Sequence, residues 1–335
     1  MNRVQQRTGV MMGVGKRPLR FTALLWGALW LIVVLLAELA LCRLFFYDRT
    51  EIFIWANVMT PYLYLPAYAI LLLAVVRRRW GLAGVSGLIV AAHLVWLAPN
   101  LAQAEALAPT AATAPSLRLF SANLFARNEQ YAAMIAEIEA ADPDVLLLQE
   151  YTPVWHAALS DAGLFAAYPY SITNIYPSPF GAAIWSKLPL QDGEVWEAGG
   201  VQMLRATLVF NEQAIRLYNV HPSPPLFALD TWNGQLGGLA AALAAETGPV
   251  VAIGDFNVTP QNYWYQELTN GRLRDAHLDR GRGLAVTWPN GYNYVPPVRL
   301  DHALLSPELI CLDIQEGLGK GSDHKPLIVD IALQT

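Results

Sequence analysis

Three long apolar runs occupy the first hundred residues of this 335-residue chain. The runs cover residues 21–46, 52–76 and 80–99. Their only charged residues are Glu38 and Arg43. A bilayer core is about 30 Å thick, and a helix of about 20 apolar residues crosses it. All three runs reach that length, so the sequence predicts a three-helix transmembrane anchor over residues 1–100, in which Pro61 and Pro66 kink the second helix.

Basic residues are concentrated before the first run and between the second and third runs. The segment before the first run contains no acidic residue, and its basic residues are Arg3, Arg7, Lys16, Arg17 and Arg20. The second loop is a run of three arginines at 77–79, whereas the first loop, residues 48–51, is nearly neutral. Because cytoplasmic loops carry the excess of Lys and Arg, three crossings place everything after Pro99 outside the cytoplasm, in a multi-pass protein of the cell membrane. Glu38 is a candidate functional carboxylate, unless it lies at the interface or pairs with Arg43.

Charge divides the chain into two parts. Residues 1–100 hold ten Lys and Arg against three Asp and Glu, a net charge of +7, whereas residues 101–335 hold twelve against twenty-four, a net charge of −12. This asymmetry indicates two parts in different surroundings. Residues 101–115 are rich in Ala, Pro and Thr and read as a linker. Residues 116–335 are then enough for one large catalytic domain.

Short apolar runs alternate with amphipathic segments in this second part. Strands are predicted at 116–120, 145–148, 182–185, 201–210, 214–220, 249–253, 298–305, 309–314 and 327–331. Helices are predicted at 131–140, from 153, and at 229–245 and 262–268. Strands outnumber helices, and several strand pairs are adjacent in sequence. The predicted fold class is therefore α/β, with two mixed β-sheets packed as a sandwich and flanked by helices.

Polar residues cluster where these strands begin or end. They are Asn123, Glu150, His221, Asp255, Asn257, Asp301, Asp323 and His324. In open α/β sheets, ligands bind beyond the strand ends. A carboxylate beside apolar strands is costly to desolvate unless something pairs with it. A hard divalent cation, which prefers oxygen ligands, would do so.

The order of these segments resembles the endonuclease/exonuclease/phosphatase superfamily. The segments are Ser121-Ala122-Asn123, Leu147-Leu148-Gln149-Glu150, Val220-His221-Pro222, Gly254-Asp255-Phe256-Asn257, Arg299-Leu300-Asp301-His302 and Gly321-Ser322-Asp323-His324-Lys325-Pro326. The resemblance covers the chain from residue 116 to its end and implies a DNase I-like fold. The anchor and the segment Thr287-Trp288-Pro289 are similar to a membrane-bound bacterial branch that includes teicoplanin-resistance-type proteins.

The resemblance also implies a metal site and a general base. Glu150 would be the main ligand of Mg²⁺ or Mn²⁺, with Asn123 beside it and Asp323 as a second or outer ligand. Such an ion polarises a phosphoryl oxygen and stabilises developing charge. His324 would be the general base that activates water, oriented by Asp301, because histidine titrates near neutral pH.

Further roles follow from the same resemblance. Asp255 would position the attacking water or the leaving group, and Asn257 would donate a hydrogen bond to a phosphate oxygen. His221 would bind the phosphate or stabilise the leaving group. Phe125 stands where many nuclease members carry an acidic residue, which leaves the number of metal ions open. His302 follows Asp301 in a strand, so it should point to the opposite face and be structural.

These observations predict a membrane-anchored, metal-dependent phosphoesterase whose catalytic domain is extracytoplasmic. The rivals are an extracytoplasmic nuclease with the same site, and a non-catalytic receptor or scaffold on the same fold. DNA binding draws on Lys and Arg, of which residues 101–335 hold only twelve against twenty-four acidic residues. Nucleic acid is therefore the less favoured partner, and a lipid-linked phosphate or pyrophosphate in the bilayer the more favoured one. The aromatic residues at 263–265, 288, 292 and 294 either lie at the headgroup level or pack in the core.

Overall fold

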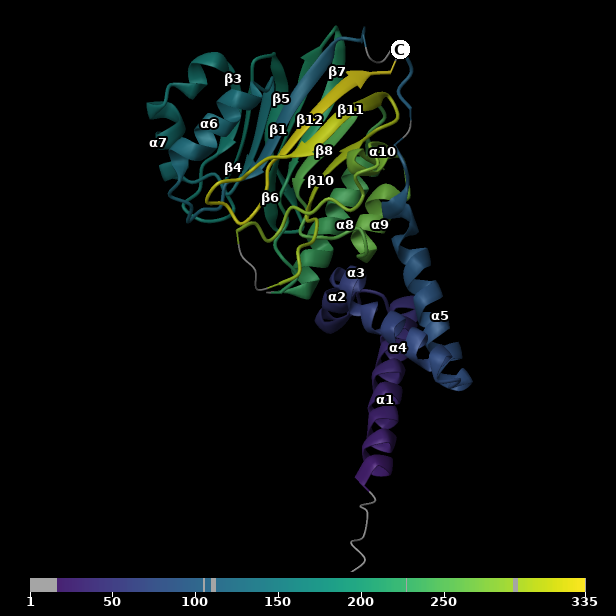
Figure 1. Ribbon diagram of the computed structural model, residues 1–335. Coiled ribbons are helices and arrows are strands. Elements are labelled where there is room, and N and C mark those ends of the chain that lie inside the picture. Colours follow the sequence, from purple (N-terminus) through teal and green to yellow (C-terminus); the bar gives the residue numbers. More distant parts are fainter. Residues whose placement is uncertain (1–16, 105, 110–112, 227, 292–294, 335) are drawn as a thin grey trace, which may run out of the picture.

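The computed structural model describes residues 17–104, 106–109, 113–226, 228–291 and 295–334. A group of helices lies below a sandwich of two β-sheets (Figure 1). The helical group consists of α1 (Arg17–Phe45), α2 (Glu51–Val58), α3 (Thr60–Leu63), α4 (Leu65–Val76), α5 (Trp80–Leu97) and the 3₁₀ turn η1 (Ala98–Leu101). Five residues named above lie outside the described residues, namely Arg3, Arg7, Lys16, Tyr292 and Tyr294.

Two of the three apolar runs form helices long and apolar enough to cross a membrane. These helices are Phe21–Phe45 and Trp80–Leu101. The second run is not one straight span, because α2 and the stretch Thr60–Val76 meet at 69°. The predicted kink is thus present, and its cause is local. Pro61 and Pro66 stand in the first turns of α3 and α4, where a proline can begin a helix but cannot continue the preceding one.

The sandwich consists of two mixed sheets, as predicted. The first sheet has the order β11-β12-β1-β2-β4-β3 and contains β1 (Ser116–Asn123), β2 (Val145–Gln149), β3 (Tyr170–Asn174), β4 (Ala182–Ser186), β11 (Leu309–Glu316) and β12 (Leu327–Leu333). The second has the order β5-β6-β7-β8-β10-β9 and contains β5 (Leu190–Ala198), β6 (Val201–Phe210), β7 (Gln213–Val220), β8 (Val250–Asp255), β9 (Arg274–Asp275) and β10 (Asp301–Leu305). Pairing is parallel between β1 and β2 and between β7 and β8, and antiparallel elsewhere among these strands.

Apolar side chains fill the space between the sheets and cover their outer faces. Leu119 and Leu147 from one sheet and Leu217 and Ile253 from the other belong to one buried cluster. The alternate residues of β1 and β2 pack against α6 (Tyr131–Ala141) and α7 (Pro153–Asp161). Those of β7 and β8 pack against α8 (Leu229–Ala245) and α9 (Tyr263–Thr269). The short α10 (Ala276–Asp279) lies beside β10 and β11.

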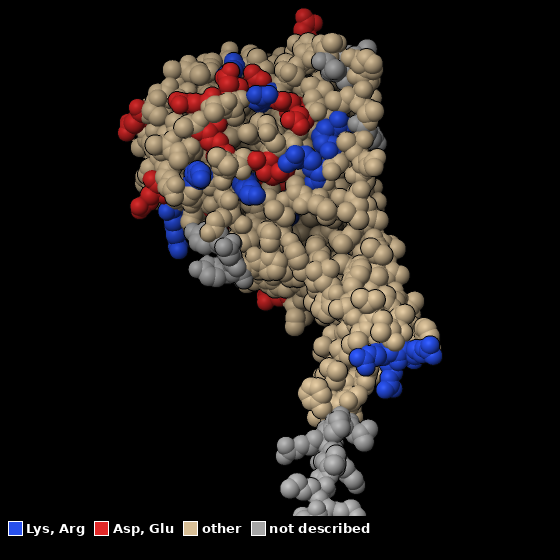
Figure 2. Space-filling view, viewed as in Figure 1, with Lys and Arg blue, Asp and Glu red and all other residues tan. Residues whose placement is uncertain are grey.

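The helical group makes specific contacts with the sandwich. Ile54 and Val58 of α2 belong to the same buried cluster as α8 and α9, and α2 and α3 lie directly beneath the sheets (Figure 1). The division of the chain at residues 100 and 116 stays a prediction, but these contacts cross it. On the face shown in Figure 2, the acidic and basic residues of the sandwich are separated from the arginines at the α4–α5 turn by a surface with few charges.

Candidate active site

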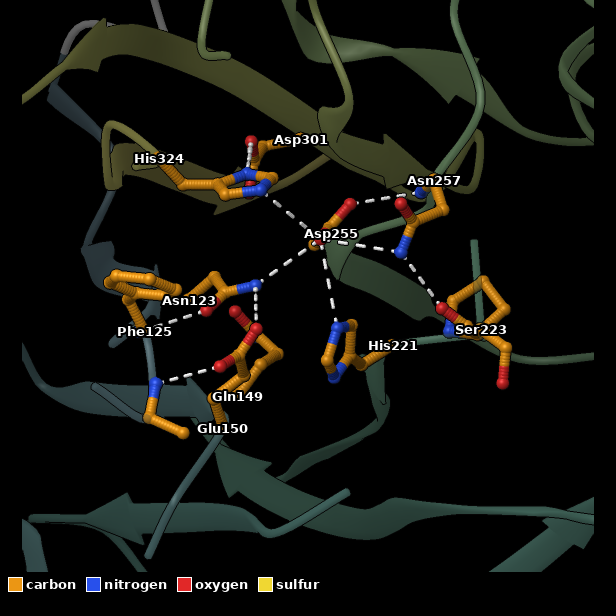
Figure 3. Close-up of polar contacts among 12 residues, drawn as sticks. Asn123, Phe125, Gln149, Glu150, His221, Ser223, Asp255, Asn257, Asp301 and His324 are labelled. Carbon is orange, nitrogen blue, oxygen red and sulfur yellow. Dashed lines mark hydrogen bonds and ion pairs between the residues drawn. The ribbon is translucent and has the colours of Figure 1, made fainter. Parts of the chain in front are cut away.

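The predicted polar residues meet at one edge of the sandwich (Figure 3). Because β1 runs parallel to β2, and β7 to β8, the carboxyl ends of these four strands lie together. A cavity of about 480 Å³ opens there. Of the eight residues, seven line it, namely Asn123, Glu150, His221, Asp255, Asn257, Asp323 and His324. The eighth, Asp301, is buried behind His324.

Asp255 occupies the centre of the group (Figure 3). Its Oδ2 lies 3.3 Å from Asn123 Nδ2, 3.5 Å from His324 Nε2 and 3.7 Å from His221 Nε2. The backbone N–H of Asn257 donates to its Oδ1 at 2.9 Å. Burial raises the pKa of Asp255, and the positive charge of His324 partly offsets this. The carboxylate therefore holds the two histidines and two amides in place around one point.

Asp301 and His324 form a buried pair. His324 Nδ1 lies 2.8 Å from Asp301 Oδ2, which leaves Nε2 toward Asp255 and the cavity. Burial alone would lower the pKa of His324, but Asp301 and Asp255 outweigh it and raise the pKa to about 10. The pair has the arrangement of a general base with its orienting carboxylate. The two carboxylates therefore favour the protonated form of the imidazole.

His221 is the less basic of the two histidines at the site. Burial lowers the pKa of His221, and the nearby Asp255 counteracts this only in part. A neutral imidazole offers one N–H donor. The Pro179 carbonyl accepts from the His221 ring, and the ring Nε2 lies 3.7 Å from Asp255 Oδ2, so His221 is a polar lining group within reach of a bound ligand.

The opposite side of the cavity carries the predicted metal ligands. Glu150 Oε2 accepts from the Ala126 N–H at 2.7 Å, and Oε1 accepts from Asn123 Nδ2 at 3.1 Å. Burial raises the pKa of Glu150, and the nearby Asp323 adds to the rise. Asp323 Oδ1 is buried and has no hydrogen-bond partner among the described residues. An orphaned carboxylate oxygen close to a second buried carboxylate fits a hard divalent cation, which would neutralise both.

Asn123 is turned away from that role in this structure. Its Oδ1 accepts from the Phe125 N–H at 3.0 Å, so its Nδ2 faces Glu150 and Asp255. Since only the amide oxygen can bind a cation, the amide would have to turn over to act as a ligand. Asp255, Asp301 and His324 form a second possible ligand group, with one ligand atom of each within 4.8 Å of the others.

Two supporting residues were given no role from the sequence. Thr287 Oγ1 accepts from the Asp301 N–H at 3.1 Å and fixes the backbone that carries the carboxylate. Ser322 Oγ donates to the Asn123 carbonyl at 2.7 Å and accepts from the His324 N–H at 3.1 Å. Both stand in segments that were named for their resemblance, Thr287 in residues 287–289 and Ser322 in residues 321–326, but a hydroxyl group alone predicts no partner.

A buried amide pair joins the two sheets beneath the cavity. Gln149 Nε2 donates to Asn219 Oδ1 at 2.6 Å and to Ser121 Oγ at 3.1 Å. Asn219 Nδ2 donates in turn to the carbonyls of Leu148 and Ala183. Asn219 interrupts an apolar strand, and this interruption was the available signal. The pair fixes the register of β2 against β7 under the site.

His302 faces away from the cavity, as strand alternation predicts. Its Nε2 lies 2.9 Å from the Val258 carbonyl and its Nδ1 3.3 Å from Asp275 Oδ2. Asp275 also accepts from Arg299 at 3.0 Å. Burial would raise the pKa of Asp275, but Arg299 and hydrogen bonds from His277 and His302 hold the pKa well below its usual value. His302 therefore belongs to a buried structural network.

Comparison with solved structures agrees with this architecture. TDP2 from D. rerio, crystallised with a single-strand DNA product, has a TM-score of 0.55 and 18% identity, covering 64% of this chain and 98% of that one. TDP2 from C. elegans has a TM-score of 0.54 and 16% identity, covering 65% and 75%. The human Nocturnin catalytic domain, with a bound sulfate anion, has a TM-score of 0.53 and 18% identity, covering 66% and 96%. At these identities the likeness shows the fold.

Comparison at the sequence level identifies the family. A search of curated proteins found no match. The family model described as Endonuclease/Exonuclease/phosphatase family matches residues 120–324, which is more than half of the chain and includes every predicted site residue. With the two mixed sheets and the residues gathered at their edge, the chain belongs to the endonuclease/exonuclease/phosphatase family.

Proposed function

We propose that this protein is a membrane-anchored, metal-dependent phosphoesterase that hydrolyses a lipid-linked phosphate ester or pyrophosphate. The observation that carries the proposal is the meeting of Glu150, Asp255 and the Asp301–His324 pair in one cavity. Its membrane-bound setting, similar to the teicoplanin-resistance-type branch, is proposed from the apolar helices α1 and α5.

Each side of the cavity has a distinct chemical role. Glu150 and Asp323 would hold Mg²⁺ or Mn²⁺, and Asn123 would join them if its amide turns over. When bound, the cation supplies positive charge that polarises a phosphoryl oxygen and favours neutral His324. His324 Nε2 then takes a proton from water, while Asp301 holds Nδ1.

The central residues position the reacting groups. Asp255 orients the attacking water or the leaving group, because its oxygens lie between His324 and His221. Asn257 Nδ2 donates to the Pro222 carbonyl at 2.8 Å in this structure, and it would turn toward a phosphate oxygen when substrate binds. His221 binds the phosphate or stabilises the leaving group.

We also propose a topology for the anchor. In it, α1, the stretch Thr60–Val76 and α5 cross a cell membrane, and the sandwich lies outside the cytoplasm. A stretch of 17 residues spans about 25 Å as helix, which is close to the thickness of a bilayer core. The arginines at 77–79 join α4 to α5 at the end away from the sheets, where the orientation rule places cytoplasmic charge.

A nuclease is the second candidate function. Its support is the fold likeness to D. rerio TDP2, whose structure holds a single-strand DNA product. Against it stands the net charge of −12 over residues 101–335, because proteins bind nucleic acid chiefly by neutralising phosphates with Lys and Arg. On the face shown in Figure 2, acidic and basic residues are interspersed and form no continuous basic surface.

A phosphate-release screen separates these candidates. The full chain, purified in detergent with Mg²⁺, is assayed against lipid phosphates, lipid pyrophosphates, sugar phosphates and plasmid DNA at low and moderate salt. We expect turnover of a lipid substrate that stops when EDTA is added. Efficient DNA cleavage beside inert lipids would instead establish the nuclease, and failure of all substrates would favour a non-catalytic receptor.

A further inference from the structure

The active-site cavity has one wall that does not come from the catalytic domain. Ile54, Trp55 and Val58 of α2 line it together with the predicted catalytic residues. These three side chains come from the apolar N-terminal part of the chain, more than sixty residues before Asn123. The helical group therefore supplies part of the active site.

Buried polar contacts fix this wall in place. Asp48, in the loop before α2, accepts from the Tyr263 N–H at 2.6 Å and from Asn262 Nδ2 at 3.1 Å. Arg43 Nη1 donates to the Gln261 carbonyl at 2.9 Å and to Asn57 Oδ1 at 2.7 Å. Since buried hydrogen bonds with charged partners are stronger than neutral ones, α2 is held against α9 as a defined surface.

A further contact ties the same helices to the loop beside the site. The hydroxyl of Tyr62, in α3, donates to the Pro297 carbonyl at 2.6 Å. Val298, the next residue in the chain, lines the cavity. The helices that follow the wall are thus bonded to the chain segment that lines the cavity at Val298.

The lining of the cavity is chemically mixed. Carboxylates, amides and histidines line it, and so do apolar residues, which include those of α2 and Phe180, Leu226 and Trp288. Phe180 and Leu226 are 48% and 47% exposed, so their apolar surface is available to a ligand. Covering apolar surface contributes about 25 cal/mol per Å². A phosphate ester without a hydrocarbon part would leave that contribution unused.

The position of the wall indicates where the hydrocarbon comes from. α2 and α3 lie between the sheets and the long apolar helices (Figure 1). In the proposed topology this is the level of the membrane surface. A cavity of about 480 Å³ is in the range of small-ligand sites, so it holds a phosphate headgroup and only the first part of a long chain.

We propose that α2 is a specificity-determining element of this active site, at which Trp55, packed on the buried Ile54 and Val58, binds the first segment of the hydrocarbon chain of a phosphate-bearing membrane lipid. Hydrolysis of that lipid rests on the proposed function, whereas its binding at α2 does not. The wall then selects substrates by their apolar part, and the polar lining residues act on the phosphate.

A binding experiment tests the wall without turnover. The full chain in detergent is photolabelled with dodecyl phosphate that carries a diazirine on the alkyl chain, and the labelled residues are mapped by mass spectrometry. We expect label on residues 54–58 that excess dodecyl phosphate displaces and butyl phosphate does not. Trp55→Ala should reduce this displaceable label, and Trp55→Phe should restore most of it.

A kinetic experiment measures the same preference. The quantity is the ratio of kcat/KM for dodecyl diphosphate to that for butyl diphosphate. Trp55→Ala should lower this ratio about tenfold, in line with the loss of a few methylene contacts. Trp80→Ala is the matched control, because Trp80 is 67% exposed and lies at the other end of the helical group; its ratio should equal that of the wild type.

The outcomes separate the two proposals. Displaceable label at α2 that depends on Trp55 supports the wall, even if neither diphosphate is hydrolysed, a result that would count only against the proposed function. The wall is overturned if α2 takes no displaceable label, if butyl phosphate displaces it equally well, or if both variants hydrolyse the pair with the wild-type ratio.

Discussion

Glu150 and His324 lie in surroundings that favour different partners for their charges. Glu150 is a buried carboxylate near a second carboxylate, so it gains from a cation. His324 is a buried imidazole between two carboxylates, which raise its pKa and favour its protonated form. Glu150 would bind the cation and His324 would take the proton from water. Substituting each residue in turn should therefore separate metal binding from turnover.

Glu150→Gln keeps the shape of the side chain and removes the charge. We expect loss of Mn²⁺ binding, measured by calorimetry, and a fall in phosphate release of about a hundredfold or more, because the cation provides charge stabilisation. His324→Ala should lower turnover by about 10²- to 10⁴-fold, the usual contribution of a general base, and still bind Mn²⁺. Near-wild-type turnover in either variant would show that its role is wrongly assigned.

Glu316, which does not line the cavity, should control the stability of the fold in acid. His277 Nε2 lies 3.2 Å from Glu316, and Arg282 donates to the same carboxylate. Burial would raise the pKa of Glu316, but these two partners lower it to about 2 from an ordinary 4.5. A lowered pKa stabilises the folded state above about pH 4.5, and this contribution is lost as the pH falls toward 2.

Glu316→Gln tests that acid dependence. The variant should unfold at a lower temperature than the wild type at pH 7, and the difference should shrink between pH 5 and pH 3. Thermal unfolding in detergent, followed by circular dichroism, measures it. Glu212→Gln at an exposed turn is the control. An equal difference at all pH values would mean that the Glu316 charge does not stabilise the fold.

At the scale of elements, the strands that carry the site and the edge strand β11 were predicted, whereas the edge strands β3, β5 and β9 were not. β2 and β8 are continuous apolar runs, which is typical of buried strands. β5 is mostly exposed, contains Gly193, and has a register shift between Gln191 and Glu194, so it shows no clear alternation. The predicted strand 298–305 begins only at Asp301, because Arg299 turns to the buried Asp275.

The contact between α2 and the catalytic domain could not be read from sequence at all. It joins residues more than two hundred positions apart, such as Asp48 and Tyr263, and nothing local marks such a pair. The site residues were found because each follows, precedes or, as Asp301 does, interrupts an apolar strand. Those that support them, such as Thr287 and Asn219, act through contacts that only the fold creates.

Asp48 is the residue on which the junction of these elements depends. Asp48→Ala would leave the buried amide groups of Asn57 and Asn262 without their acceptor, at a cost of about 1–3 kcal/mol for each unsatisfied group. We expect a clear fall in the unfolding temperature and a loss of the chain-length preference. Asp161→Ala on exposed α7 is the control. An unchanged unfolding temperature would contradict a stabilising junction.

The whole molecule combines a basic apolar part with an acidic domain. The two parts have net charges of +7 and −12. In the proposed topology the first part crosses the membrane, with its basic segments, residues 77–79 among them, on the side opposite the acidic domain. A reporter enzyme that is active only outside the cytoplasm should therefore be active when fused after Thr335. The same reporter fused near Arg78 should be inactive. The reverse pattern would invert the topology.

The presence of Ile54 and Val58 in the core of the sandwich also affects the order in which the protein is made. The ribosome completes these two residues long before it reaches Trp232 and Tyr265, which belong to the same cluster. Part of the apolar core of the later segments is thus made first, in α2. Expressed alone, residues 116–335 would expose the matching apolar surface to water, and such a surface promotes aggregation. The N-terminal helices therefore complete the core of the sandwich.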